Sequence, residues 1–107
     1  MTPAECLTIL TTTDSRPTAD ALARGAVEAR LAACAQITGP VTSVYRWRGA
    51  VETAEEWRVE FKTAAARYPD LERHLLAAHP YETPEIIATP VVRGSADYLA
   101  WLAAETA

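Results

Sequence analysis

The sequence has few of the residues that build an aromatic core, a disulfide framework or a phosphate-binding loop. Among 107 residues there are one phenylalanine, four glycines and two cysteines, Cys6 and Cys34. Two cysteines without Cys-x-x-Cys spacing exclude a disulfide scaffold and a zinc or redox motif of that type. Four scattered glycines form no phosphate loop. We therefore expect Cys6 and Cys34 to be buried free thiols toward the same end of the domain. A soft metal site or a stress disulfide is the alternative.

Basic charge and long apolar runs are also scarce. One lysine and nine arginines face 14 acidic residues, a net charge of −4, so nucleic acid and anionic membranes are not expected as partners. No apolar run approaches the roughly 18–20 residues that span a bilayer, and no secretory signal is visible at the N-terminus. Half the residues are hydrophobic, which is typical of a globular protein. We expect one domain over residues 1–107, located in the cytoplasm.

Hydrophobic periodicity and turn residues predict seven helices and strands. In chain order these are strand 6–12, helix 16–33, strands 41–48 and 51–63, helix 69–79, strand 85–92 and helix 96–105. Asp14 and Ser15 are expected to provide the capping oxygen of the first helix, and Gly94-Ser95 the cap of the last. Gly25 predicts a close contact between the first helix and the sheet. Leu71, Leu75 and Ala78 would form the inner face of the second helix. Pro90 places the last strand at a sheet edge or a bulge.

Residues 41–63 are expected to form a long hairpin that Gly39-Pro40 separates from the preceding helix. A three-residue loop at 49–51 would place Arg48 opposite Glu52 and Val41 opposite Val59. Each strand would carry one apolar and one charged face. The hairpin is about twice the common strand length, so its far end requires a second chain.

The aromatic side chains of the hairpin support the same expectation. Tyr45, Trp47 and Trp57 would share a face with Val59, and part of this apolar surface is expected to contact another subunit. The order β-α-β-β-α-β followed by a helix is typical of an α+β, ferredoxin-like domain with helices on one face of one antiparallel sheet. Right-handed crossovers then give the strand order 4-1-3-2.

Five segments form a distinctive series along the chain. They are residues 30–37 (RLAACAQI), 43–49 (SVYRWRG), 61–63 (FKT), 79–86 (HPYETPEI) and 97–102 (DYLAWL). Together they resemble the CutA divalent-cation tolerance proteins over about residues 6–103. The resemblance implies a ferredoxin-like homotrimer with hairpins paired between subunits. It also implies a cytoplasmic protein linked to tolerance of copper and other metals, without an established catalytic activity.

The segment around His79 is the candidate metal site. Pro80 and Pro84 restrict the residues before them to extended conformations, so the loop can hold His79, Glu82 and Glu85 in fixed positions. Imidazole suits copper and other transition metals, and carboxylates broaden the range of cations. We therefore expect Cu(II) or another divalent cation here, and no organic cofactor. The alternative is that the prolines only end a helix and begin a strand, and that the polar side chains form loop hydrogen bonds.

The proposed metal site is incomplete relative to some family members. They carry a cysteine late in the first strand and a histidine just before the His-Pro-Tyr, where this chain has Thr11 and Ala78. Binding through His79 alone would be weak unless other chains contribute ligands. His74 lies five residues from His79, which is not a chelating spacing on a straight helix, and we expect it to pack or to lie at the surface.

A second candidate site is a cleft between subunits. Its residues would be Lys62, as a contact for an anionic group, with Tyr45, Trp47, Tyr81 and Trp101 as an aromatic lining. The alternatives are a cross-strand ion pair for Lys62 and ordinary core packing for the aromatic rings.

These features support three functional hypotheses. The first is a homotrimeric, CutA-like protein of the divalent-metal response that binds cations weakly. The second is a regulatory module, similar in fold to the PII proteins, that binds a small molecule or a partner protein at its subunit clefts. The third is a small enzyme with His79 or Tyr81 as acid–base and Lys62 as an anion clamp. Because no catalytic signature is present, we do not expect an enzyme.

Overall fold

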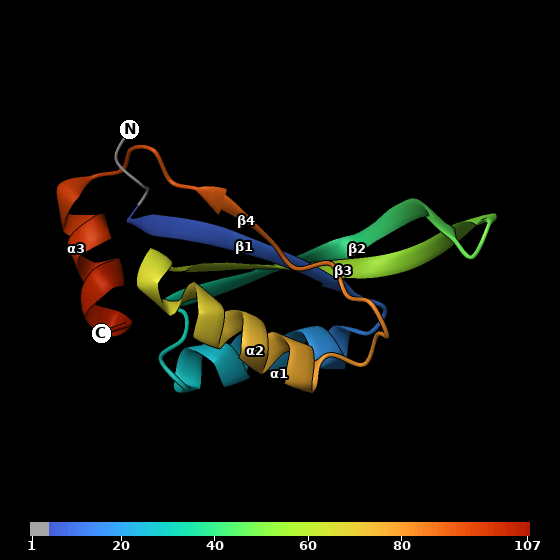
Figure 1. The fold of residues 1–107 in the computed structure, drawn as a ribbon, viewed down its shortest axis with the longest axis horizontal. Helices are drawn as coiled ribbons and strands as arrows, with labels where there is room; N and C mark the ends of the chain where they lie inside the picture. The colour runs from blue at the N-terminus through green and yellow to red at the C-terminus, as the bar shows by residue number, and fades with distance from the viewer. Residues whose placement is uncertain (1–4) are drawn as a thin grey trace.

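The computed structural model describes residues 5–107 as one four-stranded antiparallel sheet with helices packed against it (Figure 1). The elements are β1 (Cys6–Thr13), α1 (Arg16–Glu28), β2 (Cys34–Trp47), β3 (Ala50–Ala64), the 3-10 helix η1 (Ala65–Arg67), α2 (Tyr68–Ala78), β4 (Ile87–Pro90) and α3 (Ala96–Glu105). The strand order is β2-β3-β1-β4, which confirms the predicted ferredoxin-like topology. None of the helices in residues 5–107 is long and apolar enough to cross a membrane.

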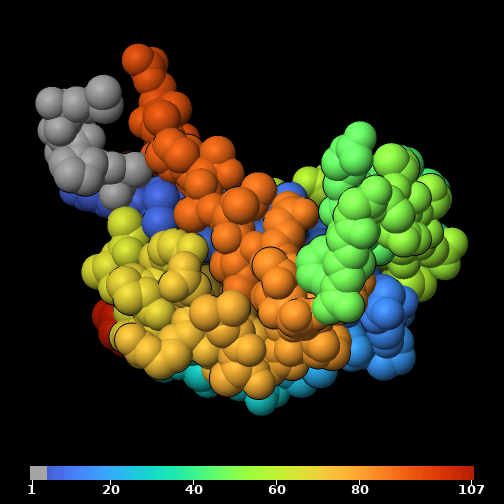
Figure 2. Space-filling view, turned by 45° about the vertical axis from the view of Figure 1, so that its right-hand side comes forward, coloured from blue at the N-terminus to red at the C-terminus, as the bar shows by residue number. Residues whose placement is uncertain are grey.

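The domain is elongated because the β2-β3 hairpin extends past the helices. Its principal extents are 44 × 31 × 22 Å. Figure 1 shows α1 and α2 together on one face of the sheet, α3 at the end near both termini, and the hairpin arm projecting at the opposite end. In the space-filling view of Figure 2 the arm (green) stands beside the segment that follows α2 (orange). These two parts of the chain enclose the cleft described below.

The hydrophobic core lies between the sheet and the two helices on its face. Ile9 of β1, Phe61 of β3, and Leu71 and Leu75 of α2 are completely buried. The core face of the strands follows the predicted alternation, because successive side chains point to opposite faces. Ala78, the last residue of α2, is exposed, so its predicted place on the inner face of α2 is wrong. The buried side chain at this end of the helix is that of His79, the residue that follows.

Helix α1 begins as predicted but ends five residues earlier. The Ser15 hydroxyl accepts a hydrogen bond from the Thr18 N–H at 3.3 Å. At the other end Arg30 has φ of 60°, and the N–H groups of Arg30 and Leu31 bond back to the carbonyls of Val27 and Ala26 at 3.0 Å. This pair of bonds is a Schellman motif, which usually has glycine at the left-handed position. The arginine at that position concealed the end of the helix.

Strand β2 begins at Cys34 and runs through Gly39-Pro40, which we had expected to break the chain. Thr38 pairs with Arg58 and Val41 pairs with Glu56, so residues 39 and 40 form a bulge. A proline is compatible with a bulge because its missing N–H leaves no ladder bond unmade. The glycine is required by close approach, since a Cβ atom there would lie 2.8 Å from Cδ1 of Trp57. The predicted pairing of Val41 with Val59 is therefore wrong.

The hairpin turn has two residues rather than the predicted three. Trp47 pairs with Ala50, and the intervening Arg48 and Gly49 have φ of 50° and 81°. Positive φ at both central positions is the pattern of a type I′ turn, whose twist matches that of the flanking strands. Glu52 therefore lies opposite Tyr45 and not opposite Arg48.

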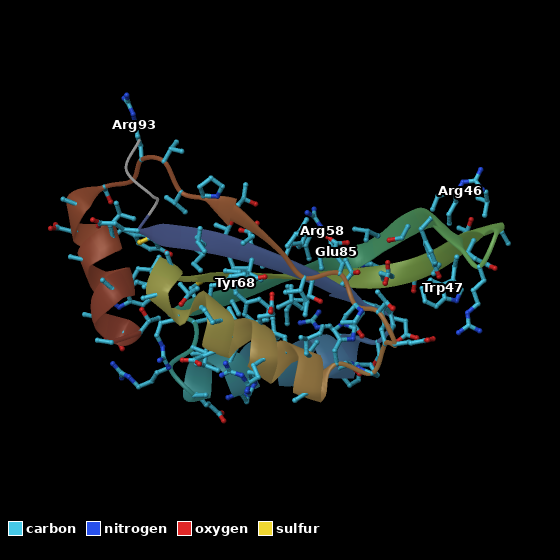
Figure 3. All side chains as sticks on the ribbon, in the orientation of Figure 1. Arg46, Trp47, Arg58, Tyr68, Glu85 and Arg93 are labelled. Atoms are coloured by element: carbon cyan, nitrogen blue, oxygen red, sulfur yellow. The ribbon has the colours of Figure 1, made fainter. Side chains whose placement is uncertain are left out.

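The bulge and the turn together change which face of the hairpin carries the aromatic rings. Tyr45 and Trp47 lie opposite Glu52 and Ala50, on the face of β3 that also carries Glu56. Trp57 is one residue further along β3 and faces the other way, so the predicted common face for these three aromatic side chains is wrong. Figure 3 shows Arg46 and Trp47 on opposite sides of the projecting arm, as the alternation requires.

The remaining local predictions have mixed outcomes. Pro90 ends β4, which pairs only with β1 and is an edge strand as predicted. Gly25 faces His74 of α2, whose Nε2 atom would lie 3.4 Å from an added Cβ, so its close contact is with a helix and not with the sheet. His74 is accordingly a packing residue, as predicted. Ser95 occupies the cap position of α3, but its side chain makes no capping hydrogen bond.

The two cysteines are free thiols near the same end of the sheet. Cys6 lies opposite Ala64 and Cys34 opposite Lys62, on the two sides of β3. Because neighbouring strands are about 4.8 Å apart, a strand between them prevents a disulfide, which needs Cα atoms within about 7 Å. Cys6 is buried, and burial, with a smaller contribution from the charge of Glu5, raises the pKa of its thiol. Cys34 is only half-buried, unlike the prediction.

Candidate functional site

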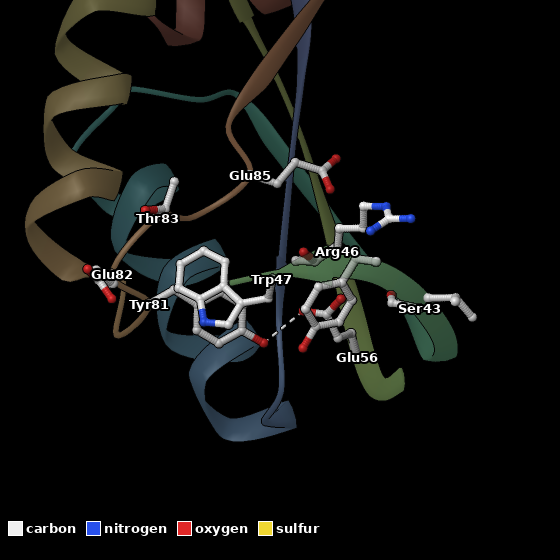
Figure 4. Close-up of a pocket in the computed structure, with 11 residues that line it drawn as sticks. Ser43, Arg46, Trp47, Glu56, Tyr81, Glu82, Thr83 and Glu85 are labelled. Atoms are coloured by element: carbon white, nitrogen blue, oxygen red, sulfur yellow. Dashed lines mark hydrogen bonds between the residues drawn. The ribbon is translucent and has the colours of Figure 1, made fainter. Parts of the chain in front are cut away.

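A cleft of about 610 Å³ lies between the hairpin arm and the loop that joins α2 to β4 (Figure 4). The arm contributes the face that carries Tyr45, Trp47 and Glu56, and β1 contributes Thr12 at the base. The loop contributes the opposite wall. The lining residues are Thr12, Ser43, Val44, Tyr45, Arg46, Trp47, Glu56, Tyr81, Glu82, Thr83 and Glu85.

The loop is held against the sheet by His79. Pro80 follows, and His79 adopts an extended conformation that ends α2. The Tyr81 N–H donates to Nδ1 of His79 at 3.1 Å, so Nε2 carries the ring proton and donates to the Thr12 carbonyl at 2.8 Å. The side chain is buried, with 8% exposed. Both ring nitrogens are therefore engaged within the chain.

Tyr81 and Glu56 connect the loop to the hairpin arm. The Tyr81 hydroxyl donates to Oε2 of Glu56 at 2.7 Å, the interaction drawn as a dashed line in Figure 4. Burial, the hydrogen bond to Glu56 and the negative charge of that carboxylate all raise the pKa of Tyr81. Glu56 itself is only 7% exposed, although Glu52 and Arg58 on the same face of β3 are exposed.

The predicted metal residues do not converge on one point. Glu82 lies at the mouth of the cleft and forms an exposed ion pair with Arg48 at 2.8 Å, and Glu85 lines the cleft further along the loop. His79 lies behind the loop and is not part of the lining. Within residues 5–107 no three His, Cys, Asp or Glu side chains are grouped closely enough to hold a metal ion.

Thr11 and Ala78, the two positions at which the sequence analysis noted the lack of a cysteine and a histidine, add no ligand to this region. Thr11 is completely buried in the core, and its hydroxyl has no hydrogen-bond partner in the part of the chain described. Ala78 is exposed and apolar. A cation that binds near the loop would therefore depend on carboxylate oxygens.

The predicted cleft residues fall into two separate groups within one chain. Tyr45, Trp47 and Tyr81 line the cleft together. Lys62 lies at the other end of β3, where its Nζ is 5.8 Å from the ring centre of Tyr98. Trp101 packs near the same tyrosine, with ring centres 5.4 Å apart.

Lys62 forms a cation–π contact and no ion pair among residues 5–107. The predicted alternative of a cross-strand ion pair is therefore absent from this part of the chain. The separation also removes Lys62 from the acid–base residues His79 and Tyr81 that the enzyme hypothesis combined with it.

Glu56 is the site residue that the sequence analysis missed. In a regular hairpin it belongs to the charged outer face, beside Arg58 and Glu60. The bulge brings Tyr45 and Trp47 onto that same face, and the loop then covers it. Gly39-Pro40 was the available signal, since a Gly-Pro pair inside alternating sequence indicates a bulge as well as a break.

Comparison with known proteins identifies the family. Residues 7–105 match the family described as CutA1 divalent ion tolerance protein. The chain belongs to this family. The resemblance drawn from the five sequence segments is thereby confirmed, and it covers both walls of the cleft.

Relatives of this CutA1 family member share most of its length. Divalent-cation tolerance protein CutA of Thermus thermophilus is 41% identical over 98 residues, which cover 92% of this chain and 95% of that protein. Protein CutA of Homo sapiens is 36% identical over 94% of this chain, but this chain spans only 56% of its length. The crystal structure of CutA from Xylella fastidiosa has a TM-score of 0.94 at 36% identity, covering 97% of this chain and 100% of that one.

Proposed function

We propose that this CutA1 family member acts in the response to divalent cations and binds them weakly through carboxylates at the mouth of the cleft. The observation that carries the proposal is the position of Glu82 and Glu85 on one proline-bounded loop, with both side chains exposed. Because both ring nitrogens of His79 are engaged, oxygen donors are the available ligands. Two carboxylates give low affinity and little preference for copper over harder cations.

The proposal includes a homotrimer, with the hairpin arms as the contact between subunits. Val44 and Val51, which lie on one face of the arm opposite Thr53 and Arg46, are 68% and 65% exposed. Tyr45 and Trp47, on the other face, line the cleft and are not part of this proposed contact. An arm with this much exposed apolar surface favours burial against another chain. In a closed ring of identical subunits every arm is buried in an equivalent contact.

The test is native mass spectrometry of the protein with added Cu(II) and, separately, Mn(II). We expect trimers that carry metal only at a large excess, and comparable occupancy for the two ions. The double variant Glu82→Gln/Glu85→Gln should lose this occupancy, whereas Glu28→Gln, an exposed control on α1, should retain it. A Cys34→Ser background separates thiol binding of copper from carboxylate binding.

Three outcomes would contradict the proposal. Monomers at micromolar concentration would contradict the proposed homotrimer. Undiminished metal occupancy in the double variant would show that Glu82 and Glu85 are not the ligands. Occupancy that is high for Cu(II), absent for Mn(II) and lost in Cys34→Ser would assign copper binding to the thiol.

A second candidate function has its own supporting observation. The aromatic walls of the cleft, Tyr45, Trp47 and Tyr81, are features of a small-molecule site rather than of a metal site. This favours a regulatory module whose ligand binds beside the hairpin arm. A ligand screen by thermal shift tests it, since a compound that binds only the folded state raises the melting temperature.

A further inference from the structure

Glu56 is a buried carboxylate whose charge is not balanced by a cation in residues 5–107. Its side chain lines the cleft and is 7% exposed. The six ion pairs of this part of the chain involve other carboxylates. Its hydrogen bond comes from the neutral Tyr81 hydroxyl and uses only Oε2. A buried charge normally has a charged partner, because removing it from water is costly unless an opposite charge compensates.

The neighbouring arginines do not supply that partner. Arg48 is paired with Glu82 at the mouth of the cleft. Arg46 borders the cleft but pairs with Val51 across the hairpin, which places its side chain on the opposite face from Tyr45 and Trp47. Counting Glu85, the cleft has more negative than positive charge around Glu56, so its electrostatic preference is for a cation.

The other walls indicate what kind of cation fits. The aromatic residues Tyr45, Trp47 and Tyr81 line the same cleft as Glu56, and Figure 4 shows the Tyr81 hydroxyl directed at Glu56 with Trp47 in the same cleft. Aromatic faces attract ammonium and guanidinium groups and also contact an apolar body. A tightly held divalent metal ion instead needs several ligands at short range, and no three His, Cys, Asp or Glu side chains of residues 5–107 are grouped around Glu56 or elsewhere. The cleft volume of about 610 Å³ is suited to a small organic molecule.

We propose that the cleft binds an organic cation, a primary ammonium or guanidinium group on a short apolar body. The charged nitrogen lies against the Glu56 carboxylate, and the apolar body lies among Tyr45, Trp47 and Tyr81. The Tyr81–Glu56 hydrogen bond holds the carboxylate in place. This inference does not depend on metal binding at Glu82 and Glu85; it specifies the ligand class for the aromatic part of the cleft.

The test compares benzylamine with benzyl alcohol, its neutral analogue, by titration calorimetry in the presence of EDTA. We expect benzylamine to bind with a dissociation constant of about 1 mM or tighter and benzyl alcohol at least tenfold more weakly. Glu56→Gln, which keeps an oxygen for the Tyr81 hydroxyl, should weaken benzylamine at least tenfold. Glu55→Gln, the adjacent strand residue on the opposite face, should leave binding within twofold.

A second measurement uses the unaltered protein and so does not depend on the folding of a variant. In nitrogen-15 NMR spectra the indole N–H of Trp47 should shift on benzylamine addition, whereas that of Trp101, at the other end of the sheet, should not. Equal shifts at both indoles would indicate non-specific binding and overturn the proposal.

The remaining outcomes separate the proposal from its rivals. Equal affinity for benzylamine and benzyl alcohol would make the cleft an apolar pocket without a role for charge. Absence of benzylamine binding up to 10 mM, about tenfold above the expected constant, would overturn the proposal and favour a basic side chain of a second copy as the partner of Glu56. Glu82→Gln/Glu85→Gln should lose metal while retaining benzylamine, so either function can fail alone.

Discussion

His79 joins helix α2 to strand β1 through a single side chain. Its Nε2 lies 2.8 Å from the carbonyl oxygen of Thr12, and its Nδ1 accepts from the N–H of Tyr81. The imidazole therefore fixes where the chain leaves α2 and how Tyr81 approaches Glu56. In this arrangement the histidine has a structural role, because one side chain connects α2, β1 and the loop.

The first prediction is that His79→Ala destabilises the protein without any metal. Loss of the ring leaves the Thr12 carbonyl and the Tyr81 N–H without partners in a largely buried place, which costs about 2–4 kcal/mol. Urea unfolding in EDTA measures this. His74→Ala, which removes a packing contact on Gly25, should cost less than about 1.5 kcal/mol. A His79→Ala variant as stable as the wild type in EDTA would contradict the structural role of His79.

The second prediction concerns alkaline pH. Because the pKa of Tyr81 is raised above its ordinary value of 10.0 in the folded state, folding keeps a proton that the unfolded chain loses. The resulting stability is complete below pH 10 and is lost as pH rises through the folded-state pKa. The free energy of unfolding should fall between pH 8.5 and pH 11 in both proteins, and by less in Tyr81→Phe than in wild type. An identical fall in both proteins would show that Tyr81 does not contribute.

The third prediction compares three buried threonines. The hydroxyls of Thr11 and Thr13 have no partner in the described chain, whereas Thr63 donates to the Leu31 carbonyl at 2.7 Å. Valine has the same shape without the hydroxyl, so Thr11→Val and Thr13→Val should each stabilise by about 1 kcal/mol. Thr63→Val should destabilise by a similar amount. Urea denaturation at neutral pH measures the change in the free energy of unfolding. A change of the same sign at all three positions would contradict the distinction between the unpaired hydroxyls of Thr11 and Thr13 and the paired hydroxyl of Thr63.

The fourth prediction compares two glycines. Gly25 lies in a helix interior, and an added Cβ would meet only the His74 ring at 3.4 Å; alanine should stabilise by about 0.5–1 kcal/mol. At Gly39 a Cβ would lie 2.8 Å from Trp57 and 3.1 Å from the Glu56 carbonyl, so Gly39→Ala should destabilise by about 1–3 kcal/mol. Melting temperatures measure both changes. A stabilised Gly39→Ala would mean that the bulge is loosely packed.

The fold could be predicted because its helices and strands have a clear hydrophobic periodicity and begin at recognisable capping residues and prolines. Strand alternation, the Ser15 cap and the two helix-opening prolines, Pro17 and Pro69, each agree with the structure. The errors in α1 and in the hairpin turn have a common cause. Arg30 and Arg48 adopt positive φ, a conformation in which sequence analysis expects glycine or asparagine. Both side chains make long-range contacts, Arg30 with the Ala104 carbonyl and Arg48 with Glu82, and local sequence does not reveal such contacts.

The candidate site could be predicted only in part for a similar reason. Tyr45, Trp47 and Tyr81 were recognisable as aromatic side chains in distinctive segments. Glu56 was not, because its burial results from a bulge in the neighbouring strand and from a loop 25 residues further along the chain. The role proposed for Glu56 depends on its position in the tertiary structure, which cannot be predicted from residue type or spacing.

The left-handed conformation of Arg30 has a consequence for the C-terminal helix. Its guanidinium donates to the Ala104 carbonyl at 3.0 Å and lies near Glu105, so a cation meets the negative end of α3. The backbone at position 30 favours glycine, while the side chain must be long and basic; both demands cannot be met by one residue. Arg30 therefore strains the backbone at the end of α1 and stabilises the C-terminal end of α3. Glycine at position 30 would relieve the strain but lose the contact with α3, and another basic residue would keep the contact and the strain.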